Sequence, residues 1–198
     1  MSTAAPLTGP ARVLVVGAGG RENALAWALL RSHGVERVWV APGNGGTLDL
    51  PGCEQLSIPE SDHDALLSTC REQAVELVVV GPEAPLAAGL GDKLRAAGIP
   101  VFGPGADGAQ LEASKQWAKA LMVEAGVPTA GYWKANSREE ALAALEAQRK
   151  PLVVKADGLA AGKGVTVADT VEEARAAIEE IFAGRFGAEA SLVLEERT

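Results

Sequence analysis

Cysteine, histidine and aromatic side chains are scarce in this sequence. Among its 198 residues, two are cysteine, two are histidine, and Phe, Trp and Tyr together make up 4%. Cys53 and Cys70 form no C-x-x-C pair, and His33 and His63 complete no metal-ligand spacing. We therefore expect no metal ligands among these residues, reduced structural thiols and a cytoplasmic protein. With so few rings, Ala, Val and Leu must fill the core.

Long apolar runs and an excess of positive charge are also missing. No run approaches the length of a membrane-spanning helix, and residues 1–10 lack the basic start and apolar stretch of a signal peptide. The 18 Lys and Arg against 26 Asp and Glu give a formal charge of −8, which argues against a broad cationic face. We expect neither a membrane nor a nucleic acid as partner. The 47% apolar content is enough for a packed core, in one domain or two.

The first half of the sequence alternates apolar, β-prone runs with helical periodicity. Strands are expected over residues 13–16, 38–40, 77–80 and 99–102, and helices over 23–30 and 86–97. The alternation predicts an α/β fold, Rossmann-like, with a parallel, doubly wound sheet. The Gly-rich turns that follow three of the strands should then lie at the carboxyl edge of the sheet, where such folds bind ligands.

The pattern changes at residues 103–108, where Pro and Gly cluster. We expect an N-terminal domain over 1–105, a linking helical segment over 106–126 and a small α+β unit over 127–198. A helix over about 111–124 should place Lys115 and Lys119 on one face. Further expected elements are strands near 130–134 and 191–196 and helices opened by capping boxes at Ser137 to Glu140 and at Thr170 to Glu173.

Three glycines and two lysines are concentrated between residues 155 and 165. Apolar, β-prone residues flank them, so the glycines should lie at the tip of a hairpin that covers phosphates. A Walker A loop does not fit, because three residues separate Gly158 from Gly162 and Gly164 follows Lys163. A nucleotide held under a hairpin flap, with Lys155 reaching in from the preceding strand, fits better. An ordinary Gly-rich hairpin with solvated lysines stays open as an alternative.

The turn at residues 17–20 suggests dinucleotide binding, but the G-x-G-x-x-G fingerprint fails because Glu22 stands at its last position. Arg21 suits a monophosphate or a carboxylate instead. The glycines of this turn either contact such a ligand or serve only the tight turn, and the sequence leaves both open.

Other polar residues near expected strand ends allow two interpretations. Glu83 stands between prolines after a buried strand, where it can bind an amine or be a solvated loop residue. Asn44 and Thr47 either hydrogen-bond a substrate or form Asx and ST turns. Glu195 and Glu196 either end a strand whose backbone meets adenine or are solvated charges. Sequence spacing does not decide among these.

Together, these motifs resemble those of the phosphoribosylamine–glycine ligase (glycinamide ribonucleotide synthetase) family of the ATP-grasp superfamily, over essentially the whole chain. The first strand and turn are similar to the family's Gly-x-Gly-Gly-Arg-Glu-His, residues 42–47 to its Pro-Gly-Asn-x-Gly-Thr, and residues 81–86 to its Gly-Pro-Glu-x-Pro-Leu. Ser114-Lys115, residues 126–130 and the loop at 155–165 resemble further motifs. The resemblance implies a preATP-grasp domain followed by the flap subdomain.

The resemblance also implies a reaction of purine biosynthesis. ATP would phosphorylate the carboxylate of glycine, and the amine of 5-phosphoribosylamine would attack the acyl phosphate to give glycinamide ribonucleotide, ADP and phosphate. The implied ATP contacts are Lys115, Lys155, Gly158, Gly162, Lys163, Gly164, Glu195, Glu196 and Arg197. The implied substrate contacts are Gly17, Gly19, Gly20, Arg21, Asn44, Thr47 and Glu83. No catalytic residue is assigned, because positioning and charge neutralisation dominate this chemistry.

The sequence departs from the family pattern in three places. Asn23 stands where the family has His, and Arg197-Thr198 stands where apolar residues are common. The chain also ends before the part that in this family binds Mg²⁺ (or Mn²⁺), so we expect no metal ligand here, no activity from this chain alone, and a complementing C-terminal segment as candidate partner. The alternatives are a non-catalytic nucleotide-binding module, another ATP-grasp carboxylate–amine ligase, and an NAD-linked oxidoreductase, which Glu22 disfavours.

Overall fold

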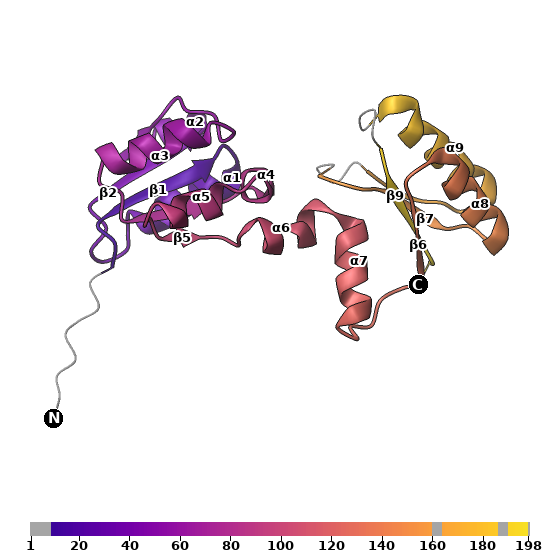
Figure 1. Ribbon diagram of the computed structural model, residues 1–198. Coiled ribbons are helices and arrows are strands. Elements are labelled where there is room, and N and C mark those ends of the chain that lie inside the picture. Colours follow the sequence, from indigo (N-terminus) through magenta and orange to yellow (C-terminus); the bar gives the residue numbers. More distant parts are fainter. Residues whose placement is uncertain (1–8, 160–163, 186–189, 198) are drawn as a thin grey trace. The chain divides into compact units, whose positions relative to one another are not determined.

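The computed structural model describes residues 9–159, 164–185 and 190–197 of the chain (Figure 1). The chain divides into two compact units, Met1–Ala109 and Gln110–Thr198. Helix α6 (Ala106–Ala113) runs across that division, whereas α7 (Lys115–Glu124) packs against strand β9 (Leu192–Glu195) of the second unit. The domain boundaries expected at residues 105 and 126 stay predictions.

The first unit is built on a parallel five-stranded sheet with the order β3-β2-β1-β4-β5. The α/β fold with a parallel sheet that the sequence predicts is therefore confirmed. The strand order reverses beside β1 (Arg12–Gly17), which pairs with β2 (Arg37–Pro42) on one side and β4 (Leu77–Val80) on the other. Because ligands of open parallel sheets bind where the order reverses, the turns that follow β1 and β4 are the expected binding edge.

Apolar side chains from β1 form cores on both faces of this sheet. Val13 and Val15 pack into a cluster with Ala26 of α1 (Gly20–Leu29), whereas Leu14 and Val16 pack into another with Leu66 of α3 (His63–Glu72). These four side chains of β1 are fully buried. A strand buried on both faces reads as a continuous apolar run, which explains why the sequence predicts β1 so clearly.

Two helices that the sequence predicts as continuous are each divided in the structure. The helix expected over 86–97 is α4 (Glu83–Ala87) followed by α5 (Leu90–Ala96), because Gly89 between them has a left-handed φ of +89°. The helix expected over 111–124 is interrupted at Ser114, which has extended backbone and accepts a hydrogen bond from the N–H of Trp117. Ser114 therefore ends α6 and caps α7.

The second unit contains an antiparallel four-stranded sheet with the order β6-β9-β7-β8. Strands β7 (Val153–Ala156) and β8 (Val165–Val167) pair directly, with Val153 opposite Val167, so the predicted hairpin is confirmed. Helices α8 (Arg138–Gln148) and α9 (Val171–Glu180) supply Leu145 and Ile178 to one core with the sheet.

The N-termini of α8 and α9 are capped by the residues that the sequence predicts. Ser137 Oγ accepts from the N–H of Glu140, and Thr170 Oγ1 accepts from the N–H of Glu173. The two glutamates, however, accept from the residue before each cap instead of from the cap itself. The elements not bounded so far are α2 (Gly45–Leu48), β3 (Cys53–Gln55), β5 (Val101–Phe102), β6 (Tyr132–Ala135) and the π-helical turn η1 (Ile181–Arg185). Within the described ranges, no helix has the length and apolar character needed to cross a membrane.

Candidate functional site

A cavity of about 560 Å³ opens in the second unit between α7 and the sheet. Its volume is within the range of ligand pockets, about 300–1,000 Å³. Apolar side chains form part of the wall and polar ones the rest. The lining residues are Leu111, Lys115, Ala118, Lys119, Met122, Thr129, Ala130, Lys155, Val165 and Glu195. This combination suits a ligand with both an apolar part and charged groups.

Three lysines and one glutamate carry the charge of this cavity. Lys115 and Lys119 come from one face of α7, as their spacing predicts, and Lys155 comes from β7. Glu195, at the end of β9, lies 2.7 Å from Lys155 and 3.3 Å from Lys119, measured from its Oε2 to each Nζ. Three ammonium groups against one carboxylate leave an excess of positive charge, which favours an anionic ligand.

The loop after β7 is attached to the N-terminus of α7 through Asp157. The Asp157 carboxylate accepts hydrogen bonds from the Ser114 hydroxyl at 3.0 Å, from the N–H of Gln116 at 3.2 Å and from the N–H of Lys115. The Nζ of Lys115 donates in return to the carbonyl of Gly158 at 2.9 Å. A carboxylate at a helix N-terminus is stabilised by the helix dipole. Asp157 therefore fixes the start of the loop, a role that the sequence analysis did not assign.

The described part of the loop agrees with a hairpin, and its Gly158 has a backbone conformation that favours glycine. Gly158 has a φ of +87°, and the carbonyl of Gly164 accepts from the N–H of Ala156 at 2.7 Å. The predicted phosphate contacts Gly162 and Lys163 lie outside the described residues. Their role stays a prediction.

Glu196 and Arg197 follow β9 but do not line the cavity. The N–H of Glu196 donates to Gly131 at 2.9 Å, and its carboxylate pairs with Lys150 at 2.6 Å, which lowers the pKa of Glu196. Arg197 donates to the carbonyl of Ala168 and to Asp169. Their side chains therefore hold neighbouring loops together, and the predicted contact of this segment with adenine would depend on its backbone.

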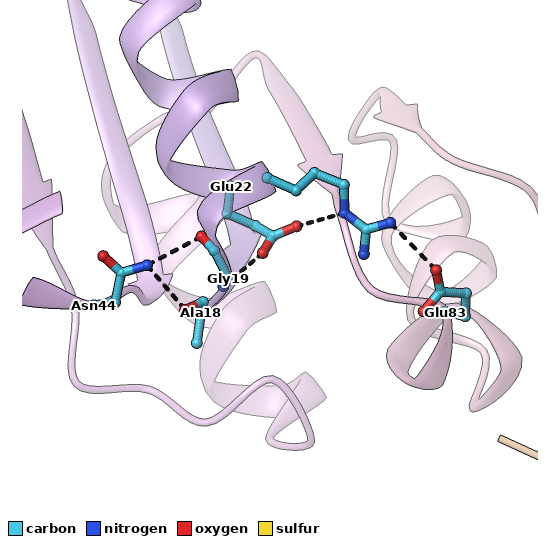
Figure 2. A network of polar contacts seen from close by, with 6 residues as sticks. Ala18, Gly19, Glu22, Asn44 and Glu83 are labelled. Atoms are coloured by element: carbon cyan, nitrogen blue, oxygen red, sulfur yellow. Dashed lines mark hydrogen bonds and ion pairs between the residues drawn. The ribbon is translucent and has the colours of Figure 1, made fainter. Parts of the chain in front are cut away.

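In the first unit, Glu22 is a buried carboxylate at the turn after β1 (Figure 2). Its Oε2 accepts from the N–H of Gly19 at 2.7 Å, and its Oε1 accepts from Nε of Arg21 at 2.9 Å. Arg21 then reaches Glu83, with its Nη1 3.2 Å from Oε1 of that residue. The chain of contacts joins the turn after β1 to the start of α4 after β4.

The neighbouring glycines leave room for Glu22. A Cβ at Gly81 would lie 1.9 Å from Oε1 of Glu22, and one at Gly17 would lie 2.7 Å from its Cγ. A Cβ at Gly19 would lie 2.8 Å from Oε2, whereas a Cβ at Gly20 would meet nothing within 4 Å. Gly17, Gly19 and Gly81 thus leave room for the buried carboxylate, whereas Gly20 does not contact it. The sequence alone shows Glu22 only as a mismatch in a fingerprint.

The loop after β2 is attached to the same turn by Asn44. Its Nδ2 donates to the carbonyls of Ala18 and Gly19 at 2.9 and 3.0 Å, and its Oδ1 accepts from Gly46 at 2.8 Å (Figure 2). Thr47 is fully buried, and its Oγ1 donates to the carbonyl of Asn44 at 2.7 Å. Asn44 therefore forms the Asx turn that the sequence left open, whereas Thr47 bonds back to Asn44 in a capping box at the start of α2 instead of forming an ST turn. Through Asn44, this loop is attached to the turn after β1.

Charges at this edge are stabilised by their neighbours. The hydrogen bond to Glu22 raises the pKa of Arg21 above its usual value. A hydrogen bond from its own backbone, and then the Arg21 guanidinium, hold the pKa of Glu83 below its usual value. Arg21 and Glu83 are about half exposed, at 53% and 43% of their side chains, so both remain charged and accessible at neutral pH. The pair presents a cation and an anion side by side to a polar ligand.

A parallel-sheet unit followed by a hairpin-bearing unit with a cationic cavity is the architecture of an ATP-grasp protein. Residues 11–112 match the family model "Phosphoribosylglycinamide synthetase, N domain", and residues 113–198 match "Phosphoribosylglycinamide synthetase, ATP-grasp (A) domain". The chain therefore belongs to the phosphoribosylglycinamide synthetase family. The family resemblance stated from the motifs is confirmed.

Individual relatives agree with this assignment. The chain is 55% identical over 188 residues to phosphoribosylamine–glycine ligase of Nostoc sp., covering 93% of this chain and 44% of the relative. It is 52% identical to the human trifunctional purine biosynthetic protein adenosine-3, covering 94% of this chain and 19% of that protein. The crystal structure of phosphoribosylamine–glycine ligase from Thermotoga maritima superposes with a TM-score of 0.72 at 31% identity, covering 94% of this chain and 44% of that one. The chain thus spans under half the length of these relatives.

Proposed function

We propose that this chain is the N-terminal portion of a phosphoribosylamine–glycine ligase. The reaction would join glycine to 5-phosphoribosylamine at the expense of ATP, through an acyl phosphate, and would give glycinamide ribonucleotide, ADP and phosphate. The observation that supports this proposal most directly is the cavity with Lys115, Lys119 and Lys155 beside the glycine hairpin, located within the residues that match the ATP-grasp domain.

In the second unit, the proposed ligand is ATP. Lys115 and Lys155 would neutralise its phosphates, and the apolar wall of the cavity would hold the adenine ring. Gly158, Gly162, Lys163 and Gly164 would close over the phosphates as a flap, and the backbone of residues 195–197 would border the adenine. These groups would bind ATP and orient its phosphates. Positioning and charge neutralisation would lower the barrier to phosphoryl transfer, with no covalent enzyme intermediate.

In the first unit, the proposed ligands are 5-phosphoribosylamine and glycine. Gly17, Gly19, Gly20 and Arg21 would face the anionic group, and Glu83 the amine. Asn44 would line the same edge, while the buried Thr47 would act by holding Asn44 in place. Arg21 is oriented for this role by Glu22, because the carboxylate fixes its Nε and leaves the guanidinium half exposed.

The Mg²⁺ (or Mn²⁺) expected for this family does not fit the described residues. They contain no group of three or more His, Cys, Asp or Glu side chains able to hold a metal ion. Among the described residues that line the cavity, Glu195 supplies the one carboxylate, and two lysines already neutralise it. The roles proposed above therefore involve no metal.

Calorimetry with ATP tests the nucleotide site. We expect ATP to bind the chain, and Lys155→Met to weaken binding by about tenfold through loss of a charge-assisted contact. The matched control is Lys134→Met, which removes an exposed lysine outside the cavity and should change affinity by less than about twofold. Absence of heat at millimolar ATP would refute the nucleotide site.

Phosphate release tests the reaction. We expect no phosphate release from these 198 residues alone. When the chain is combined with the C-terminal part of a full-length relative, we expect phosphate release that depends on glycine and 5-phosphoribosylamine. ATP binding without such release in the combined protein would favour a non-catalytic nucleotide-binding module. Release triggered by a different amine would favour another ATP-grasp carboxylate–amine ligase.

A further inference from the structure

Glu195 is a buried carboxylate with two lysine partners, one held by several other contacts and one held by Glu195 alone among the described residues. Only 9% of its side chain is exposed, and its Oε2 faces both Lys119 and Lys155. One buried carboxylate needs one counter-ion, and a second one is not required for neutrality. The difference between the two lysines indicates what the second one is for.

Lys119 is held in place by several groups. Its side chain is 10% exposed, and its Nζ donates to Thr129 Oγ1 at 2.6 Å and to the carbonyl of Ala130 at 3.4 Å. The same Nζ lies 5.5 Å from the ring centre of Tyr132. These contacts come from the segment that leads into β6, so Lys119 is anchored independently of Glu195.

Lys155 is less constrained. Its side chain is 27% exposed, and its Nζ contacts Glu195 alone among the described residues. It can leave Glu195 by rotation of its own side chain, and it lines the cavity. Moving it away from an otherwise unpaired buried carboxylate would be costly, but Lys119 remains beside Glu195 when Lys155 leaves.

We propose that Lys119 is the permanent counter-ion of Glu195, and that it thereby frees Lys155 to bind the anionic ligand. Lys119 is in this sense a positioning residue: it acts through Glu195 on Lys155 and need not touch the ligand. The inference rests on the proposed nucleotide site for the identity of the anion, but the exchange of partners at Glu195 can be tested without any nucleotide.

The first test measures the reactivity of Lys155 in the unliganded chain. The chain is acetylated briefly with N-hydroxysuccinimidyl acetate, and peptide mapping gives the rate at each lysine. In Lys119→Met, Lys155 becomes the sole partner of Glu195 among the described residues, and the labelling of Lys155 should slow by about threefold or more. Labelling of Lys155 that is unchanged or faster in folded Lys119→Met would overturn the proposal.

Two further variants control this test. Lys150→Met removes the neighbouring ion pair with Glu196, which is exposed, and should leave the rate at Lys155 unchanged. The double variant Lys119→Met/Glu195→Gln removes both charges and should label at Lys155 as fast as Glu195→Gln alone. If Lys119→Met does not fold, the comparison of these two labelling rates tests the proposal instead. Slower labelling of Lys155 in the double variant than in Glu195→Gln would contradict it.

The second test measures affinity for ADP by calorimetry. Lys119→Met should weaken binding by about tenfold, because Lys155 is retained by Glu195. Adding Glu195→Gln to Lys119→Met should restore part of the affinity for ADP. If Lys119 has a merely structural role, the double variant should bind ADP no more tightly than Lys119→Met. If the wild-type chain binds no ADP, the nucleotide site is refuted while the labelling rates still decide the role of Lys119.

Discussion

At the scale of single residues, buried ionisable groups determine the geometry of both candidate sites. Glu22 lies at the turn after β1 with only 3% of its surface exposed, and its carboxylate binds the N–H of Gly19 and the side chain of Arg21. A buried carboxylate is tolerated where charge-assisted hydrogen bonds replace water. Removing it takes the acceptor away from the N–H of Gly19 and from Nε of Arg21.

Glu22→Ala should therefore lower the free energy of unfolding by about 2 kcal/mol, through the lost hydrogen bond to Gly19 and the space left between the glycines. Urea unfolding of the chain measures this change. Glu83→Ala is the comparison, since that carboxylate is 43% exposed and should cost less than about 0.5 kcal/mol. Equal losses for the two variants would contradict a central role for Glu22.

A second residue-scale prediction concerns pH. Burial raises the pKa of the Cys70 thiol from 9.0 to about 11. A group whose pKa is raised by folding stabilises the folded state below its unfolded pKa, and this contribution is lost as the pH rises towards the folded value. The stability difference between the wild type and Cys70→Ala should therefore narrow by about 1.3 kcal/mol between pH 8 and pH 10. Urea unfolding at both pH values checks it, and a constant difference would show that Cys70 titrates normally.

At the scale of elements, the hairpin and α7 behave as one assembly because Asp157 caps the helix from the loop. Asp157→Ala removes acceptors for the Ser114 hydroxyl and for two backbone N–H groups, and should cost about 2–3 kcal/mol in urea unfolding. Ser137→Ala, which removes an ordinary cap on α8, should cost about 1 kcal/mol. If Asp157→Ala lowers the free energy of unfolding no more than Ser137→Ala does, the loop does not stabilise α7.

Local patterns in the sequence predict the elements whose own residues determine them. The run at β1, the hairpin glycines and the caps Ser137 and Thr170 are such cases. The short β3 and helices α2 and α3 were not predicted, and two helices were predicted as continuous. A strand of three residues has no measurable periodicity, and Gly89 and Ser114 are compatible with either a helix interior or a break until tertiary packing decides.

The candidate sites are less predictable than the strands, because their contacts join distant segments. The spacing of Lys115 and Lys119 shows that they share a face, but not that Glu195 pairs with Lys119. Asp157 has no local signal either, since its partners lie about 40 residues earlier in the chain. Glu22 bonds its sequence neighbours Gly19 and Arg21, but its burial against Gly81 follows from strand order. The contacts proposed for ATP and the substrates remain predictions from the family motifs.

At the scale of the whole molecule, each of the two units has a sheet and a core of its own. The described residues that line the cationic cavity all belong to the second unit. ATP binding is therefore expected to stabilise the second unit against local unfolding more than the first unit.

Hydrogen exchange with and without ATP tests this expectation. Amides of β7, β9 and α7 should exchange at least about tenfold more slowly with saturating ATP, whereas those of β1 and β4 should not change. Lys155→Met at the same ATP concentration should remove the protection. Protection that appears first in β1 and β4 would place the nucleotide in the other unit.

The contact between Glu22 and Gly81 has a consequence for sequence evolution. Gly81 has no left-handed φ, and the three atoms nearest to the position of its missing Cβ all belong to Glu22, with Oε1 at 1.9 Å. A side chain at position 81 therefore requires Glu22 to move from its buried position or to be replaced by a shorter residue. The two positions, far apart in the chain, should be inherited as a pair, and homologues that carry alanine at 81 should lack glutamate at 22.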